Sequence, residues 1–102
     1  MQKMKEADLQ KTILDYLRLK RYFVWKEHTT GIMKKNGSYI PSGMVGKSDI
    51  LGLTKQGRFI AIECKIRGNS LSSSQQEFLQ HIADNGGLAI VAFGLEDVQK
   101  YL

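Results

Sequence analysis

The stretch that decides the fold is residues 49–66, DILGLTKQGRFIAIECKI. It holds two apolar runs, residues 49–53 and 59–66, separated by the polar turn Thr54-Lys55-Gln56-Gly57. Apolar and β-branched runs joined by a short turn with a glycine predict a β-hairpin. Successive residues of a strand point to opposite faces of the sheet. The core face of the second run therefore consists of Ile60, Ile62, Cys64 and Ile66. Its opposite face consists of Phe59, Ala61, Glu63 and Lys65.

Upstream of this hairpin, the sequence predicts a helix, a strand and a loop. Residues 6–19 place Leu9 and Ile13 at helical spacing with charged residues elsewhere on the wheel, which is typical of an amphipathic helix. Residues 22–28 are aromatic and β-branched and predict a strand. Residues 29–48 contain four glycines and the chain's proline, and we expect one long loop there.

Downstream of the hairpin, the sequence predicts a crossover. Ser72 and Gln75 have the spacing of a capping box and begin a helix over residues 73–85. The apolar residues 88–93 predict a strand buried on both faces, and residues 95–102 a last short helix. The order α-β-β-β-α-β-α predicts an α/β fold with a mixed central sheet flanked by helices, whose last strand runs parallel to its neighbour.

Length and composition restrict the class of protein. The chain has 102 residues, of which 42% are hydrophobic and 25% charged, so we expect one globular domain over residues 1–102. No apolar run is long enough for a membrane span, and the first residues lack the apolar core of a signal peptide. The chain's one cysteine, Cys64, cannot form an internal disulfide. We therefore expect a reducing compartment, the cytoplasm, or the host cytoplasm if the chain is phage-encoded.

Charge is distributed unevenly along the chain. Residues 1–67 carry 14 of the 15 lysines and arginines but only six of the 10 acidic residues. A basic surface of this kind is suited to a polyanion such as nucleic acid. The alternative is a surplus of charge that serves only solubility.

The hairpin also brings chemically useful residues together. Asp49 opens the first strand and can lie across from Glu63 in the second, with Lys65 two residues further on. Two carboxylates form an oxygen-rich site suited to Mg²⁺ or Mn²⁺, and a nearby lysine can stabilise charge on a phosphate. These are the parts that phosphodiester hydrolysis needs. The alternative is an ordinary cross-strand salt bridge of Glu63.

Several motifs match a known family in order and spacing. Asp49, thirteen residues and then Glu63-Cys64-Lys65 resembles the D…(D/E)-x-K core of the PD-(D/E)XK nuclease superfamily, with Ser48 in the place of the proline. Residues 46–50 (GKSDI), 71–78 (LSSSQQEF) and 86–91 (GGLAIV) resemble the VRR-Nuc branch of that superfamily. The resemblance extends from Glu6 to the C-terminus and implies a minimal restriction-endonuclease-like fold.

The resemblance implies roles for residues of the hairpin. Asp49 and Glu63 are expected to be metal ligands and catalytic residues, and the backbone carbonyl of Cys64 is expected to complete the protein's ligands. Lys65 is expected to be the catalytic lysine. The Cys64 thiol lies on the apolar face and is expected to be a core group, not a nucleophile.

Residues outside the hairpin are expected to contribute as well. By the resemblance, Gln75 reaches the active site from its helix, although its alternative role as the capping partner of Ser72 explains the same sequence. The resemblance also implies an acid of the first helix as a further metal ligand, and Glu6 fits this role because it shares the inward face of that helix; an exposed, dipole-stabilised acid is the alternative. The loop lysines expected to contact phosphate are Lys34, Lys35 and Lys47, unless they are simply solvated.

These features predict a metal-dependent DNA endonuclease that uses Mg²⁺ or Mn²⁺. The VRR-Nuc resemblance implies a stand-alone form of phage or bacterial type that acts on branched DNA such as Holliday junctions. One alternative is a basic nucleic-acid-binding module without catalysis, in which Asp49, Glu63 and Lys65 form a surface ion network. Another is a structural subunit of a phage particle that binds neither metal nor DNA.

We further expect a homodimer. A four-way junction must be cut on two strands related by approximate two-fold symmetry, and a chain of this size offers one active site. The alternative is that the aromatic and apolar residues outside the predicted hairpin close the core of a monomer. The residues expected at the dimer contact are Tyr16, Tyr22, Phe23, Trp25, Ile32, Met33, Tyr39, Ile40 and Met44.

Overall fold

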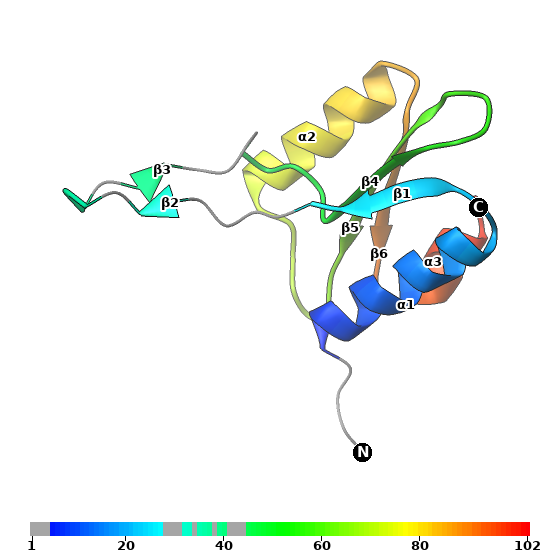
Figure 1. Ribbon diagram of the computed structural model, residues 1–102, viewed down its shortest axis with the longest axis horizontal. Coiled ribbons are helices and arrows are strands. Elements are labelled where there is room, and N and C mark those ends of the chain that lie inside the picture. The colour runs from blue at the N-terminus through cyan, green and yellow to red at the C-terminus, as the bar shows by residue number, and fades with distance from the viewer. Residues whose placement is uncertain (1–4, 28–31, 34, 38, 41–44) are drawn as a thin grey trace.

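The structure is a computed structural model that describes residues 5–27, 32–33, 35–37, 39–40 and 45–102. The helices and strands in chain order are α1 (Glu6–Leu19), β1 (Phe23–Lys26), β2 (Ile32–Met33), β3 (Tyr39–Ile40), β4 (Ile50–Leu53), β5 (Phe59–Cys64), α2 (Ser73–Asp84), β6 (Leu88–Ala92) and α3 (Leu95–Gln99). Figure 1 shows their arrangement.

The main sheet has four strands in the order β1-β4-β5-β6. β1, β4 and β5 are antiparallel neighbours, and β6 returns parallel to β5 after the crossover through α2. The predicted hairpin, mixed sheet and parallel last strand are therefore confirmed. In the hairpin Ile50 lies opposite Ile62. The same register brings Asp49, the residue before β4, to the position opposite Glu63 at the open end of the hairpin.

Helices cover both faces of this sheet and give three layers (Figure 1). α1 and α3 cover one face, and α2 covers the other. The predicted alternation along β5 is confirmed, because its two sets of side chains enter different cores. The core under α1 and α3 includes Leu9, Ile13, Leu17, Ile60, Ile62, Cys64 and Val98, and the core under α2 includes Leu51, Ala61 and Leu79.

Two elements differ from the sequence prediction. Residues 29–48 do not form one plain loop, because β2 and β3 pair there as a separate two-stranded sheet. Strands of two residues are too short to show a periodic pattern, so the glycines and the proline dominate that stretch of sequence. β6 contacts α2 and α3, but it is only partly buried, since it is an edge strand with one hydrogen-bonded neighbour.

Within the described part of the chain, no helix has the length and apolar character that a membrane span requires.

Candidate metal centre

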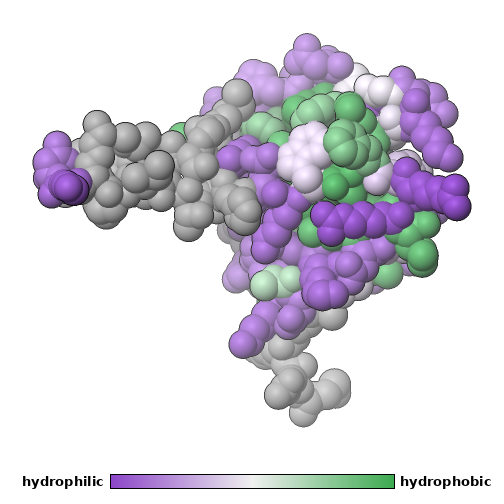
Figure 2. Space-filling model, in the orientation of Figure 1, coloured by the Kyte–Doolittle hydropathy of each residue, from purple (hydrophilic) through white to green (hydrophobic). Residues whose placement is uncertain are grey.

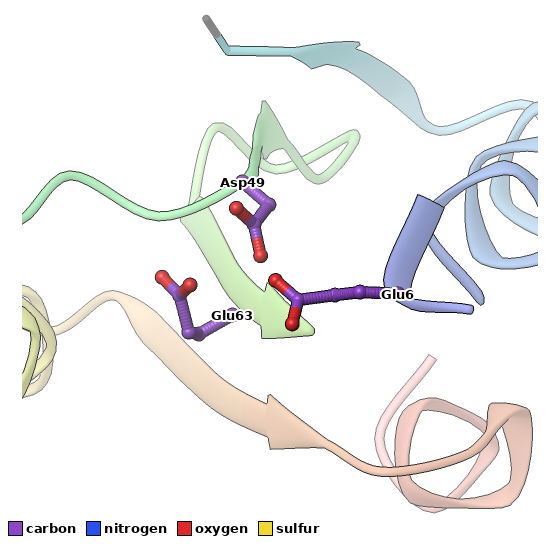
Figure 3. Close-up of side chains that lie close together, drawn as sticks. All are labelled: Glu6, Asp49 and Glu63. Atoms are coloured by element: carbon purple, nitrogen blue, oxygen red, sulfur yellow. The ribbon is translucent and has the colours of Figure 1, made fainter. Parts of the chain in front are cut away.

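Three carboxylates converge at the end of the sheet where the hairpin opens. Glu6 is the first residue of α1, Asp49 precedes β4, and Glu63 lies in β5. One oxygen of each can be chosen so that all three lie within 4.8 Å of one another. Figure 3 shows the three carboxyl groups pointing toward a common point. Carboxylate oxygens at this separation are suited to hard divalent cations such as Mg²⁺ and Mn²⁺.

The fold explains why residues so distant in sequence meet here. The antiparallel register of β4 and β5 brings Asp49 beside Glu63. α1 packs Leu9 and Ile13 into the core, and this contact places its first residue, Glu6, at the same end of the sheet. The prediction that Glu6 points inward agrees with its position in this cluster, since Glu6 is only partly exposed.

The carboxylate of Asp49 is held in place by a main-chain donor. Its Oδ2 accepts a hydrogen bond of 2.8 Å from the N–H of Cys64. The main chain at Cys64 therefore lies at the site, where its carbonyl was predicted to act as a ligand. The thiol of Cys64 is buried in the core, and this burial, with the nearby charge of Asp49, raises its pKa. The thiol stays protonated, as expected for a core group.

Glu63 is a buried acid with an incompletely satisfied carboxyl group. Its exposed fraction is 1%. Oε1 accepts a hydrogen bond from the Gln75 side chain, whereas Oε2 is buried with no hydrogen-bond partner. Burial, reinforced by the negative charge of Asp49, raises the pKa of Glu63 to about 8, although Lys65 acts in the opposite direction. A buried oxygen without a donor, next to two other carboxylates, fits the coordination of a cation.

Gln75 makes the contacts of both alternatives between which the sequence could not choose. Its backbone N–H donates to Ser72 Oγ at 3.2 Å, and its Oε1 accepts from the Ser72 N–H at 2.9 Å, which completes the predicted capping box. At the same time its Nε2 donates to Glu63 Oε1 at 3.1 Å. The two ends of one amide thus join the start of α2 to the carboxylate cluster.

Lys65 follows β5 at the edge of the cluster. Its N–H donates to the carbonyl of Ala92 at 2.9 Å, which holds the main chain in the sheet. Its side chain is half-buried, and its charge lowers the pKa of Glu63, so the ammonium acts on that carboxylate. Among the residues that the structure describes, no carboxylate lies within 4.0 Å of the Lys65 ammonium.

The three loop lysines that were expected to contact phosphate have different placements. Lys35 is exposed in the turn between β2 and β3, and Lys34 lies outside the described residues. Lys47 was expected to be exposed. Its side chain is instead only 10% exposed, and its ammonium pairs with Glu27 at 2.9 Å. The sequence interpretation did not assign a role to Glu27. The signal that could have identified it is the register of β1 and β4, which places the residue after β1 beside Asp49.

Comparisons with known proteins agree with this fold. The family model described as the VRR-NUC domain matches residues 4–95. A solved structure described as a VRR_NUC domain protein matches with a TM-score of 0.69 and 20% sequence identity, covering 100% of this chain and 91% of that chain. At that identity the likeness shows the fold. No curated protein matches the chain.

Proposed function

The chain belongs to the VRR-NUC domain family, a family of nuclease-type domains that process nucleic acids, and on this basis we propose that it is a metal-dependent DNA endonuclease. The observation that carries the metal dependence is the orphaned oxygen of Glu63 inside a group of three carboxylates. Mg²⁺ or Mn²⁺ is the proposed cofactor, because all available ligands are oxygens.

The proposed ligands are Glu6, Asp49, Glu63 and the backbone carbonyl of Cys64. A divalent cation at this place supplies Lewis-acid stabilisation of a phosphate oxygen and lowers the pKa of water. Gln75 keeps the Glu63 carboxyl oriented through its hydrogen bond to Oε1. Lys65 provides a positive charge next to the cluster, where negative charge develops on the scissile phosphate.

The burial of Glu63 argues against the alternative of a binding module without catalysis. In that alternative the charged residues of the hairpin form a surface ion network, which requires solvated carboxylates. Glu63 is instead 1% exposed and next to two other acids. Burying a carboxylate beside two others lowers the stability of the fold, and costly groups of this kind cluster at functional sites.

We propose branched DNA, such as a Holliday junction, as the substrate, and a homodimer as the active form. β1 is an edge strand, and Phe23 on it is 68% exposed with its ring centroid 5.4 Å from that of Trp25. Leu51, the strand neighbour of Trp25, lines a hollow of about 710 Å³ together with apolar residues such as Phe59 and Phe78 and with polar ones such as Glu77 and His81. Figure 2 shows an apolar area between α2 and β1, bordered by hydrophilic residues. A second copy of the chain is the proposed partner for this area.

Of the other residues that were expected at the dimer contact, some pack in the core of the monomer and some lie outside the described part of the chain. Tyr16 and Tyr22 pack against the core under α1 and α3, so they help to close the monomer. Met44 lies outside the described residues, as do the side chains of β2 and β3.

Lys34 and Lys35 remain the proposed phosphate contacts of the loop. The lone thiol of Cys64 favours a reducing cytoplasm as the location.

The proposed function is tested by incubating the protein with linear duplex, single-stranded, flap and four-way-junction DNA, with Mg²⁺, with Mn²⁺ and with a chelator. We expect metal-dependent cleavage with preference for branched substrates. The variant Asp49→Asn is expected to lose cleavage and to retain DNA binding, because it removes a ligand charge and also a repulsion toward phosphate. Cleavage that persists in the chelator or in Asp49→Asn contradicts the proposal.

The role of Lys65 is tested by Lys65→Ala. We expect turnover to fall by about 10²–10³-fold, the usual loss for one electrostatic contact in the transition state. Mn²⁺ affinity, measured by calorimetry, should not decrease, since the variant removes a cation beside the site. Lys55→Ala is the matched control, because Lys55 is exposed in the turn between β4 and β5. Weakened Mn²⁺ binding together with retained turnover in Lys65→Ala contradicts the assigned role.

A further inference from the structure

Glu27, the residue after β1, holds the segment that leads into Asp49 by both its main chain and its side chain. Its N–H donates to the Asp49 carbonyl at 2.8 Å. Its Oε2 pairs with the ammonium of Lys47 at 2.9 Å, two residues before Asp49. Its Oε1 accepts a hydrogen bond of 2.7 Å from the indole N–H of Trp25. These contacts tie the edge strand β1 to residues 47–49.

The ion pair is partly shielded from water. The side chain of Lys47 is 10% exposed and that of Glu27 is 25% exposed. At this burial the attraction between the charges is stronger than in a solvated surface pair. Removing the charge of Glu27 leaves the Lys47 ammonium without its counter-ion in a poorly solvated place, which favours movement of Lys47 and its neighbours toward solvent. Asp49 is two residues from Lys47 and is displaced with it.

We propose that Glu27 is a positioning residue: together with Lys47 it fixes the main chain at Asp49, so that the Asp49 carboxylate stays directed toward Glu6 and Glu63. The consequence for metal affinity depends on the proposed function, whereas the effect on the position of Asp49 does not. Groups that orient metal ligands in this way contribute about 10–100-fold to metal affinity.

The N–H of Cys64 provides a reporter that needs no metal. It donates to Asp49 Oδ2, so its hydrogen exchange measures whether that carboxylate is in place. The next amide, that of Lys65, is an internal control, because it donates to Ala92 on the opposite side of β5. In Glu27→Gln, which keeps an acceptor for Trp25, we expect exchange of the Cys64 amide to accelerate about tenfold, as for the loss of a hydrogen bond to a charged group. Exchange of the Lys65 amide is expected to stay unchanged.

Mn²⁺ affinity, measured by calorimetry, tests the same inference at the metal site. We expect Glu27→Gln and Lys47→Met each to weaken binding by about 10–100-fold. The double variant should lose little more than either single variant, because the two residues act as one unit. Asp15→Asn is the matched control, since it removes the same charge from an exposed ion pair with Lys11 on α1. It should leave both Cys64 exchange and Mn²⁺ affinity unchanged.

Each other outcome has a defined meaning. Unchanged Cys64 exchange in Glu27→Gln overturns the inference, and so does an equal acceleration at Lys65, which indicates general loosening of the sheet end. If the two substitutions weaken Mn²⁺ binding additively in the double variant, Glu27 does not act through Lys47, and this part of the inference is wrong. If the unaltered protein fails to bind Mn²⁺ while Cys64 exchange responds as expected, the proposed metal function is wrong and the positioning of Asp49 by Glu27 stands.

Discussion

The Glu63 carboxyl is a buried acid whose charged form the surrounding structure disfavours. Its pKa is about 8, against an ordinary value of 4.5, because of burial and the charge of Asp49. Between these two pH values the folded protein holds a proton that the unfolded chain releases. The metal-free protein therefore loses stability as the pH rises through this range. At the proposed metal site a divalent cation would replace this proton, so metal affinity should rise with pH over the same interval.

The variant Glu63→Gln should remove this pH dependence. Its neutral amide is expected to raise the melting temperature of the chelator-treated protein above pH 8 by at least about 4 °C and to flatten the melting profile at lower pH. Cleavage and stabilisation by Mn²⁺ should both be lost. The measurement is thermal unfolding across pH, with chelator and with Mn²⁺.

Glu77→Gln is the control for this experiment, because Glu77 is an exposed acid on α2 outside the cluster. It should leave the pH profile of the melting temperature unchanged. A profile of Glu63→Gln that parallels the unaltered protein contradicts a raised pKa at Glu63.

At the scale of elements, the segment before β4 packs closely against the first turn of α2. Gly46 has a φ of +80°, and a Cβ added there would lie 2.3 Å from the carbonyl oxygen of Ser74. This close approach places the segment that carries Asp49 beside the helix start that carries Gln75. A side chain at position 46 has to separate the two segments.

Gly46→Ala should therefore destabilise the protein and weaken Mn²⁺ binding. The positive φ costs about 1–2 kcal/mol and the steric conflict about 1–3 kcal/mol more. Gly57→Ala is a matched control, since Gly57 has a φ of +84° in the hairpin turn and nothing within 4 Å of an added Cβ. Urea unfolding should show the φ cost alone in Gly57→Ala, with Mn²⁺ affinity retained. Equal losses of stability in the two variants contradict a contact between residue 46 and α2.

At the scale of the whole molecule, the layers formed by the described residues leave part of the sheet uncovered. α2 covers β5 and β6, whereas the β1 edge on the same face carries the exposed Phe23 ring beside Trp25. In the proposed dimer this area is buried against a second copy. Truncation of a buried aromatic anchor at an interface commonly weakens association by tenfold or more.

Phe23→Ser should therefore shift the protein toward the monomer. Light scattering is expected to give twice the 11.5 kDa chain mass for the unaltered protein and a mass near one chain for the variant at micromolar concentration. Tyr101→Ser is the control, because Tyr101 is similarly exposed, at 63%, and follows α3 in the opposite layer. A protein of one-chain mass that still cuts four-way junctions symmetrically contradicts the dimer.

The sequence by itself determined the two strands of the hairpin, the turn between them and the start of α2. Local signals were sufficient for these features: the two-residue period of residues 59–66, the turn at Gly57 and the capping box of Ser72 and Gln75. Each depends on residues a few positions apart, so no long-range contact is needed to predict it. The spacing between Asp49 and Glu63 was likewise enough to predict that they meet across the hairpin.

Only the tertiary structure decided how these parts combine. The pKa of Glu63 depends on burial beneath segments distant in sequence, and Gln75 serves both the cap and Glu63 because α2 packs beside β5. The pairing of Lys47 with Glu27, in place of an exposed phosphate contact, follows from the register of β1 against β4. Burial and long-range pairing arise when the layers assemble, and a local pattern of residues does not encode them.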